Sequence, residues 1–209
     1  MLYRFLFPIV NWLVRVVAYV TVSGVENMPR SGGVLLVSNH LTNLDPLIIG
    51  MCFKRELHFM AKTELFKNPL LARVITALNA FPVRRGEPDR GALRQAEALL
   101  HGGRVVAIFP EGHRSRHNGV QESRGGIALL ARRAGVPILP VGITGTQHLR
   151  ARALLRWRPW RRPHITVTVG APFTLPHPDG RPDYSALAGV IMGHVAELLP
   201  SAYRGVFGE

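Results

Sequence analysis

The sequence predicts an α/β fold in which a mixed, largely parallel sheet is flanked by helices. Short apolar runs bounded by turn residues, such as residues 33–38 and 104–109, alternate with longer segments whose apolar residues recur at helical spacing. The chain has 209 residues, which is enough to bury one complete core, and no segment repeats at a fixed period. We therefore expect one domain over residues 23–209, preceded by an apolar segment over residues 1–22.

The apolar segment over residues 1–22 is interrupted by Arg4, Pro8, Asn11 and Arg15. A transmembrane helix needs about 20 apolar residues with few charges, and a cleavable signal needs small residues after its apolar stretch. Neither pattern fits well. Aromatic residues of the kind that lie at the lipid headgroup level accompany the arginines: Tyr3, Trp12 and Tyr19. We predict a helix in the membrane interface, with a buried core helix as the alternative and a spanning helix as the least favoured.

Six segments have the length and composition of strands. Residues 33–38 and 104–109 are short, aliphatic and bounded by turns, which is typical of strands buried on both faces. Residues 80–83 contain Pro82, which cannot donate to a ladder and therefore favours an edge position. The other strand segments are residues 57–60, 137–143 and 164–169.

Helices are predicted between these strands from their caps and spacing. Asp45 followed by Pro46 is typical of a helix N-cap with proline at the first helical position, and Asn68 precedes a second proline at the start of a helix over residues 67–78. Residues 89–101 have apolar side chains at helical spacing and end at two glycines. The remaining helices are expected over residues 126–133 and 185–199.

The composition is strongly basic and nearly free of cysteine. Lysine and arginine number 26 against 13 acidic residues, a formal net charge of +13, so we expect an anionic partner. Nucleic acid, an acidic lipid surface and phosphorylated small molecules all fit that charge. Cys52 is the only cysteine, which excludes an intrachain disulfide and a multi-cysteine metal site and is compatible with a reducing compartment.

A basic and aromatic stretch covers residues 150–162, where arginines are interleaved with Trp157 and Trp160. Such a stretch suits an anionic membrane, and it also suits single-stranded nucleic acid, whose bases stack on tryptophan. The apolar N-terminal segment favours the membrane. A solvated arginine-rich face remains open as the third interpretation.

His40 and Asp45 form the candidate catalytic pair. They lie in the turn over residues 39–46, directly after the strand at 33–38. An imidazole can accept a proton from an alcohol near neutral pH, and a neighbouring carboxylate orients the ring and stabilises the imidazolium. A turn histidine beside a capping aspartate is the alternative without catalysis.

Two further strand ends carry candidate ligands for an anion. After the strand at 104–109 come Glu111, Gly112 and Arg114, at the position where open α/β sheets place ligand chemistry. Glycine permits a close backbone approach, arginine can bind phosphate with two hydrogen bonds, and a carboxylate can accept from a polyol hydroxyl. Arg84 and Arg85 follow the strand at 80–83 and should point to opposite faces, so spacing alone does not decide which of them enters a shared site.

In combination these blocks resemble the glycerolipid acyltransferase family, in particular its bacterial 1-acyl-sn-glycerol-3-phosphate acyltransferases. Asn39 to Asp45 is similar to the family's His-x4-Asp signature, and residues 81–85 and 109–115 are similar to its second and third blocks. Residues 136–141 are similar to the apolar fourth block, with a structural and acyl-lining role. The resemblance covers about residues 24–170. Two positions differ from the family pattern and bear on the identity of the acceptor: His113 replaces a threonine, and Arg124 stands alone beside two glycines.

The resemblance implies transfer of a fatty acyl group from acyl-CoA or acyl carrier protein to 1-acylglycerol 3-phosphate, which gives phosphatidic acid. It implies His40 as general base, Asp45 as its partner, and an acceptor site formed by Arg85, Glu111, Gly112 and Arg114. No cofactor, no metal and no nucleic acid are implied. We expect a peripheral protein on an anionic membrane surface at the cytoplasmic face.

Three alternatives stay open at this level. Another lysolipid or polyol can be the acceptor, and a basic membrane- or nucleic-acid-binding module would need only the charge. A metal-dependent phosphoesterase would use His40, Asp45, Glu111 and His113, although the chain has no His-Glu-x-x-His motif.

Overall fold

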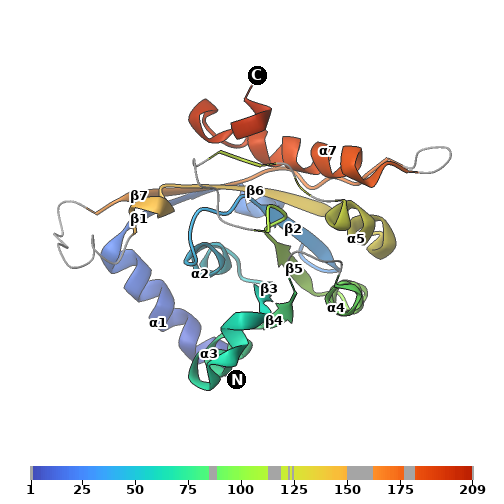
Figure 1. The fold of residues 1–209 in the computed structure, drawn as a ribbon. Coiled ribbons are helices and arrows are strands. Elements are labelled where there is room, and N and C mark those ends of the chain that lie inside the picture. Colours follow the sequence, from blue (N-terminus) through green and yellow to red (C-terminus); the bar gives the residue numbers. More distant parts are fainter. Residues whose placement is uncertain are drawn as a thin grey trace.

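The computed structural model describes residues 2–84, 89–112, 119–121, 123, 125–149, 162–176 and 182–208. Within them one seven-stranded sheet has the order β1-β7-β6-β2-β5-β3-β4 (Figure 1). Every neighbouring pair is parallel except β6 with β7, which confirms the predicted mixed and largely parallel sheet. The strands are β1 (Tyr19–Ser23), β2 (Val34–Ser38), β3 (Leu57–Lys62), β4 (Ala80–Val83), β5 (Val105–Ile108), β6 (Ile138–Thr144) and β7 (His164–Val169).

Helices cover both faces of this sheet (Figure 1). One apolar layer packs under α4, α5 and α7, and the other packs under α1 and α2. Because both faces are covered, Val34–Val37 of the central strand β2 are fully buried, as the unbroken aliphatic run predicts. The helices are α1 (Leu2–Val17), α2 (Asp45–Met51), α3 (Pro69–Ala77), α4 (Arg90–His101), α5 (Gly126–Ala134) and α7 (Tyr184–Glu197).

Three helices begin at the side-chain caps that the sequence offers. The side chains of Asn68, Asp89 and Asp183 each accept hydrogen bonds from the backbone N–H groups of the residues two and three positions further on. Gly135 ends α5 with a left-handed backbone, the conformation that glycine adopts without penalty. The predicted strand at 80–83 is β4, and it lies at the edge of the sheet.

The N-terminal segment contains a strand as well as the expected helix, because α1 ends at Val17. Tyr19–Ser23 form the edge strand β1, which pairs in parallel with β7. Val14 and Ala18 are buried in the same layer as α2, so one face of α1 belongs to the core. Of the described helices, none combines the length and the apolar character needed to cross a bilayer.

Candidate active site

His40, Asp45 and Glu111 come together because three neighbouring strands end at one edge of the sheet. β2 lies between β5 and β6 and is parallel to both, so the loops that follow these strands leave from the same side. His40 follows β2, Glu111 follows β5, and Thr146 follows β6. In open α/β sheets this edge is where ligands bind.

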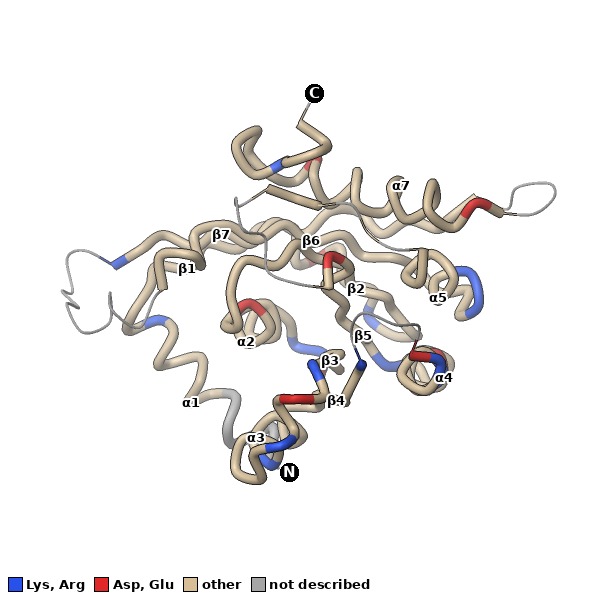
Figure 2. Tube along the Cα trace, in the orientation of Figure 1, with Lys and Arg blue, Asp and Glu red and all other residues tan. Residues whose placement is uncertain are grey.

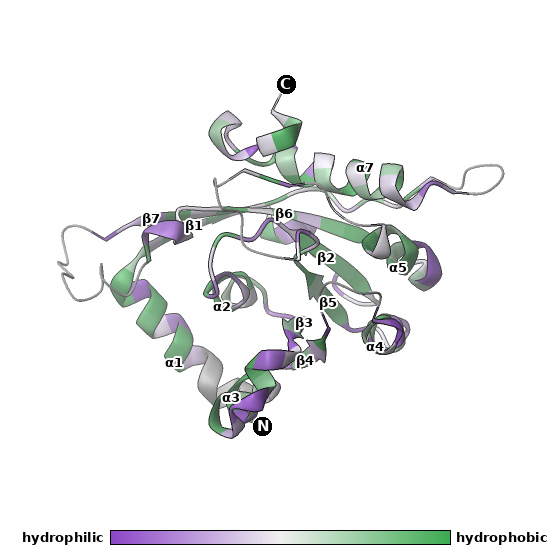
Figure 3. Cartoon of the chain, in the orientation of Figure 1, coloured by the Kyte–Doolittle hydropathy of each residue, from purple (hydrophilic) through white to green (hydrophobic). Residues whose placement is uncertain are grey.

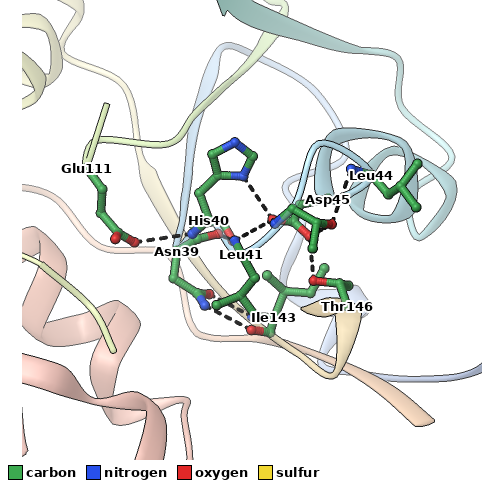
Figure 4. A network of polar contacts seen from close by, with 10 residues as sticks. Asn39, His40, Leu41, Leu44, Asp45, Glu111, Ile143 and Thr146 are labelled. Atoms are coloured by element: carbon green, nitrogen blue, oxygen red, sulfur yellow. Dashed lines mark hydrogen bonds and ion pairs between the residues drawn. The ribbon is translucent and has the colours of Figure 1, made fainter. Parts of the chain in front are cut away.

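His40 and Asp45 form a buried pair in this position. The imidazole Nδ1 lies 2.9 Å from Asp45 Oδ2, and the two side chains are 6% and 0% exposed (Figure 4). Nε2 is on the opposite side of the ring and points away from the carboxylate (Figure 4). With Nδ1 protonated and donating to the carboxylate, Nε2 carries the free electron pair of a base.

The Asp45 carboxylate is held by four further hydrogen bonds. Oδ2 accepts from the backbone N–H groups of Leu41 and Thr42 at 2.6 and 2.7 Å. Oδ1 accepts from the hydroxyls of Thr42 and Thr146 at 3.0 and 2.6 Å. With these donors the carboxylate has little freedom to rotate, so it orients the imidazole as a fixed support.

The expected capping role of Asp45 is wrong in detail. Asp45 is the first residue of α2, and Leu44 precedes the helix without a side-chain cap. Its carboxylate turns back toward Leu41 and Thr42 instead of forward to the helix N–H groups. The hydrogen bonds to the preceding turn and to His40 are favoured over capping of α2, because they surround the buried carboxylate with donors.

Glu111 also contacts the histidine loop. Its carboxylate oxygen Oε1 accepts the backbone N–H of His40 at 3.2 Å, and the residue is 6% exposed. Gly112 follows in an exposed turn with a φ of 67°, a backbone conformation that favours glycine. Phe109 stacks on the His40 ring with centroids 4.4 Å apart. The loop after β5 therefore supports the histidine through both backbone and side chain.

Two supporting residues were missed by sequence reasoning. Asn39 donates to Ile143 O and accepts from Ile143 N at 2.9 and 2.8 Å, which extends the contact between β2 and β6 by one side chain (Figure 4). Thr146 is fully buried. It follows Gly145, whose φ is 86° and where a Cβ would collide with the carbonyl oxygen of His164. The sequence signal for Thr146 was the preceding Gly145, because a glycine with positive φ allows the tight turn that places Thr146 in the core.

The remaining predicted residues are not all described. Arg85 and Arg114 lie outside the described residues, as do His113, Arg124 and residues 150–161 of the basic and aromatic stretch. Arg84 is engaged elsewhere: its backbone N–H donates to Asp89 and is the main cause that lowers the pKa of that carboxyl. Among the described residues no group of three histidine, cysteine or acidic side chains could hold a metal ion.

Comparisons with known proteins identify the family of this chain and a related fold. The sequence profile of the family described as Acyltransferase matches residues 19–144. The 1-acyl-sn-glycerol-3-phosphate acyltransferase of Borreliella burgdorferi is 30% identical over 139 residues, which cover 66% of this chain and 55% of that protein. The protein of the same description from Bacillus subtilis is 31% identical over 121 residues, covering 57% of this chain and 60% of its own. The chain thus spans little more than half the length of these relatives.

A solved structure is also similar. It is the 1-acyl-sn-glycerophosphate acyltransferase PlsC from Thermotoga maritima, with a TM-score of 0.66 and 25% sequence identity. The alignment covers 94% of this chain and 81% of that one. The similarity to this structure therefore extends over nearly the whole length of the present chain.

Proposed function

Because this chain belongs to the acyltransferase family, we propose that it moves a fatty acyl group from a thioester donor to the free hydroxyl of 1-acylglycerol 3-phosphate, giving phosphatidic acid. The observation that carries the proposal is the His40–Asp45 pair at the carboxyl end of β2, at 2.9 Å and buried. The names of the Borreliella and Bacillus relatives support the acceptor. Acyl-CoA or acyl carrier protein is the proposed donor.

In this proposal His40 acts as general base through Nε2. It removes the proton of the acceptor hydroxyl while that oxygen attacks the thioester carbonyl, and a tetrahedral intermediate forms. When the intermediate collapses, the C–S bond breaks and the imidazolium returns the proton to the thiolate. The negative charge of Asp45 stabilises the imidazolium between these two steps.

The acceptor is proposed to be held through its phosphate and its glycerol. Arg85 and Arg114 are the proposed phosphate ligands, since a guanidinium matches phosphate oxygens with two hydrogen bonds. Gly112 gives the backbone room to approach, and Glu111, whose Oε1 accepts from His40 N, is proposed to lie beside the glycerol. Their contribution is orientation of the attacking hydroxyl.

Direct transfer needs neither a metal nor a covalent enzyme intermediate. Cys52, the single cysteine, would be a poor nucleophile, because burial raises its thiol pKa to about 12 and almost no thiolate exists at neutral pH. The Cys52 thiol, just past the end of α2, donates to Ile48 O.

The proposed location is the cytoplasmic face of the membrane, with α1 in the lipid interface. Ile9, Trp12 and Leu13 are exposed on α1, while Val14 on its other face is buried. Arg162 lies over the ring of Tyr19 at 3.9 Å and donates to Arg15 O, which adds a cationic group beside this helix. An anionic lipid surface fits the net charge of +13.

The proposed function is tested with one labelled acyl-CoA donor and a panel of lysolipid acceptors, with and without a strong chelator. We expect phosphatidic acid from 1-acylglycerol 3-phosphate, and the same rate in the chelator. Preference for a lysolipid without the terminal phosphate would reassign the acceptor. Loss of activity in the chelator would favour the metal-dependent alternative, and binding of nucleic acid without turnover would favour the binding module.

Thr146→Val is expected to lower kcat about tenfold with little change in KM, because Asp45 loses one buried hydrogen bond while the acceptor contacts remain. Valine keeps the shape of threonine without its hydroxyl. The measurement is steady-state kinetics, which separates the change in kcat from any change in KM. Thr146→Ser should restore most of the activity; equal kinetics for all three proteins would leave Thr146 with a packing role only.

A further inference from the structure

Helix α3 is an apolar helix without a buried residue. It comprises Pro69–Ala77, six of its nine residues are aliphatic, and none of the nine is buried. Leu70 is 72% exposed, Leu71 39% and Val74 41%, and Leu65 of the preceding turn is also 39% exposed. A soluble surface seldom collects so many large aliphatic side chains in one place, so this helix is expected to have a partner.

The exposed leucine and valine side chains lie on one side of the helix. At 3.6 residues per turn, Leu70, Val74 and Leu71 fall within an arc of about 100°, which is the width of an amphipathic face. Arg73 is exposed and lies next to this arc, and Lys67 is exposed just before the helix begins. Basic residues lie along and beside α3 in Figure 2, and the green parts of α3 in Figure 3 are its hydrophobic residues.

The position of α3 relates it to α1. Both helices lie on the side of the sheet away from α7 (Figure 1). α1 exposes Ile9, Trp12 and Leu13, so apolar side chains are available on two helices of this side. We propose that α3 is a second lipid-docking element: Leu70, Leu71 and Val74 enter the interface of an anionic bilayer, and Lys67 and Arg73 meet its headgroups.

A lipid surface fits these observations better than a protein partner. A helix of nine residues is about 14 Å long, which is too short to supply the roughly 800 Å² that each partner of a stable protein pair buries. A bilayer can bind a small apolar face, and nearby basic residues strengthen that binding through anionic headgroups. The inference goes beyond the proposed function, on which it rests only for the choice of lipid as the partner.

The test compares vesicle binding by the full chain and by the double variant Leu70→Ser/Val74→Ser. The vesicles are phosphatidylcholine with one third phosphatidylglycerol, and binding is followed by co-sedimentation. Losing two inserted aliphatic side chains should weaken binding about tenfold or more, while the melting temperature stays the same. The matched control is Val190→Ser/Val206→Ser, at residues 46% and 57% exposed on the opposite side of the sheet, which should bind like the unmodified chain.

Activity on two forms of substrate separates this inference from the proposed function. The α3 variant should lose activity on lysophosphatidic acid presented in vesicles but keep it on a short-chain monomeric lysophosphatidate. Unchanged vesicle binding by the α3 variant would overturn the inference, as would a dimer that dissociates in this variant. So would a defect seen only when acyl carrier protein is the donor. Absence of turnover by every protein, together with α3-dependent vesicle binding, would overturn the proposed function and leave the inference intact.

Discussion

His40→Ala is expected to lower kcat by about 10² to 10⁴ while the fold persists. The variant removes the imidazole whose Nε2 is proposed to accept the hydroxyl proton. The backbone N–H at position 40 remains and can still donate to Glu111. The measurement is turnover at saturating acceptor, accompanied by circular dichroism. KM for the acceptor should change little, since its proposed ligands are left in place.

An exposed histidine provides the control for this prediction. His101 ends α4 and is exposed, so His101→Ala removes an imidazole without touching the site. It should retain full turnover. If purified His40→Ala were as active as His101→Ala, the assignment of the general base would be wrong.

Asp45→Asn is expected to lower kcat by a comparable factor of about 10² to 10⁴, because an amide can present only one acceptor oxygen. Oδ2 accepts from His40 and two backbone N–H groups, and Oδ1 accepts from two hydroxyls. With its NH2 group in the place of Oδ2, the amide faces two backbone N–H donors and leaves the imidazole in the wrong tautomer. With its NH2 group in the place of Oδ1, it faces the two hydroxyls that donate to Asp45. We also expect the free energy of unfolding to fall by about 1–3 kcal/mol.

A second aspartate separates the catalytic loss from the structural one. Asp89 likewise accepts backbone N–H groups, from Arg84, Gly91 and Ala92, but it caps α4 and has no contact with His40. Asp89→Asn should reduce stability with kcat nearly unchanged. A similar loss of kcat in both variants would mean that Asp45 acts only through stability.

Much of the fold could be predicted because its signals are local. The strand at 33–38 was recognisable from an unbroken aliphatic run, and the starts of α3 and α4 from Asn68 and Asp89, whose side chains need only the next few residues. Strand β1 could not be found in this way. Tyr19–Ser23 follow an apolar helix directly, and what makes them a strand is the ladder with β7, more than 140 residues away.

In the candidate site, too, the residues with local signals could be predicted and those that depend on distant segments could not. His40 and Asp45 could be paired from sequence, because five residues of turn join them and the motif resembles that of a known family. The roles of Asn39 and Thr146 depend on β6 lying beside β2, which no local pattern specifies. The capping role expected of Asp45 failed because its carboxylate accepts from the preceding turn and from His40, and one further donor, Thr146, lies 101 residues along the chain.

By itself the sequence determined the excess of positive charge, indicated which segments are buried, and supplied the candidates for the chemistry. These properties follow from side-chain types and their spacing. Only the tertiary structure decided that the loops after β2, β5 and β6 share one edge, that five donors hold Asp45, and that the aliphatic side chains of α3 remain uncovered. Those facts depend on the order of strands in the sheet and on what each helix packs against, because contacts between distant segments form only when the whole core assembles.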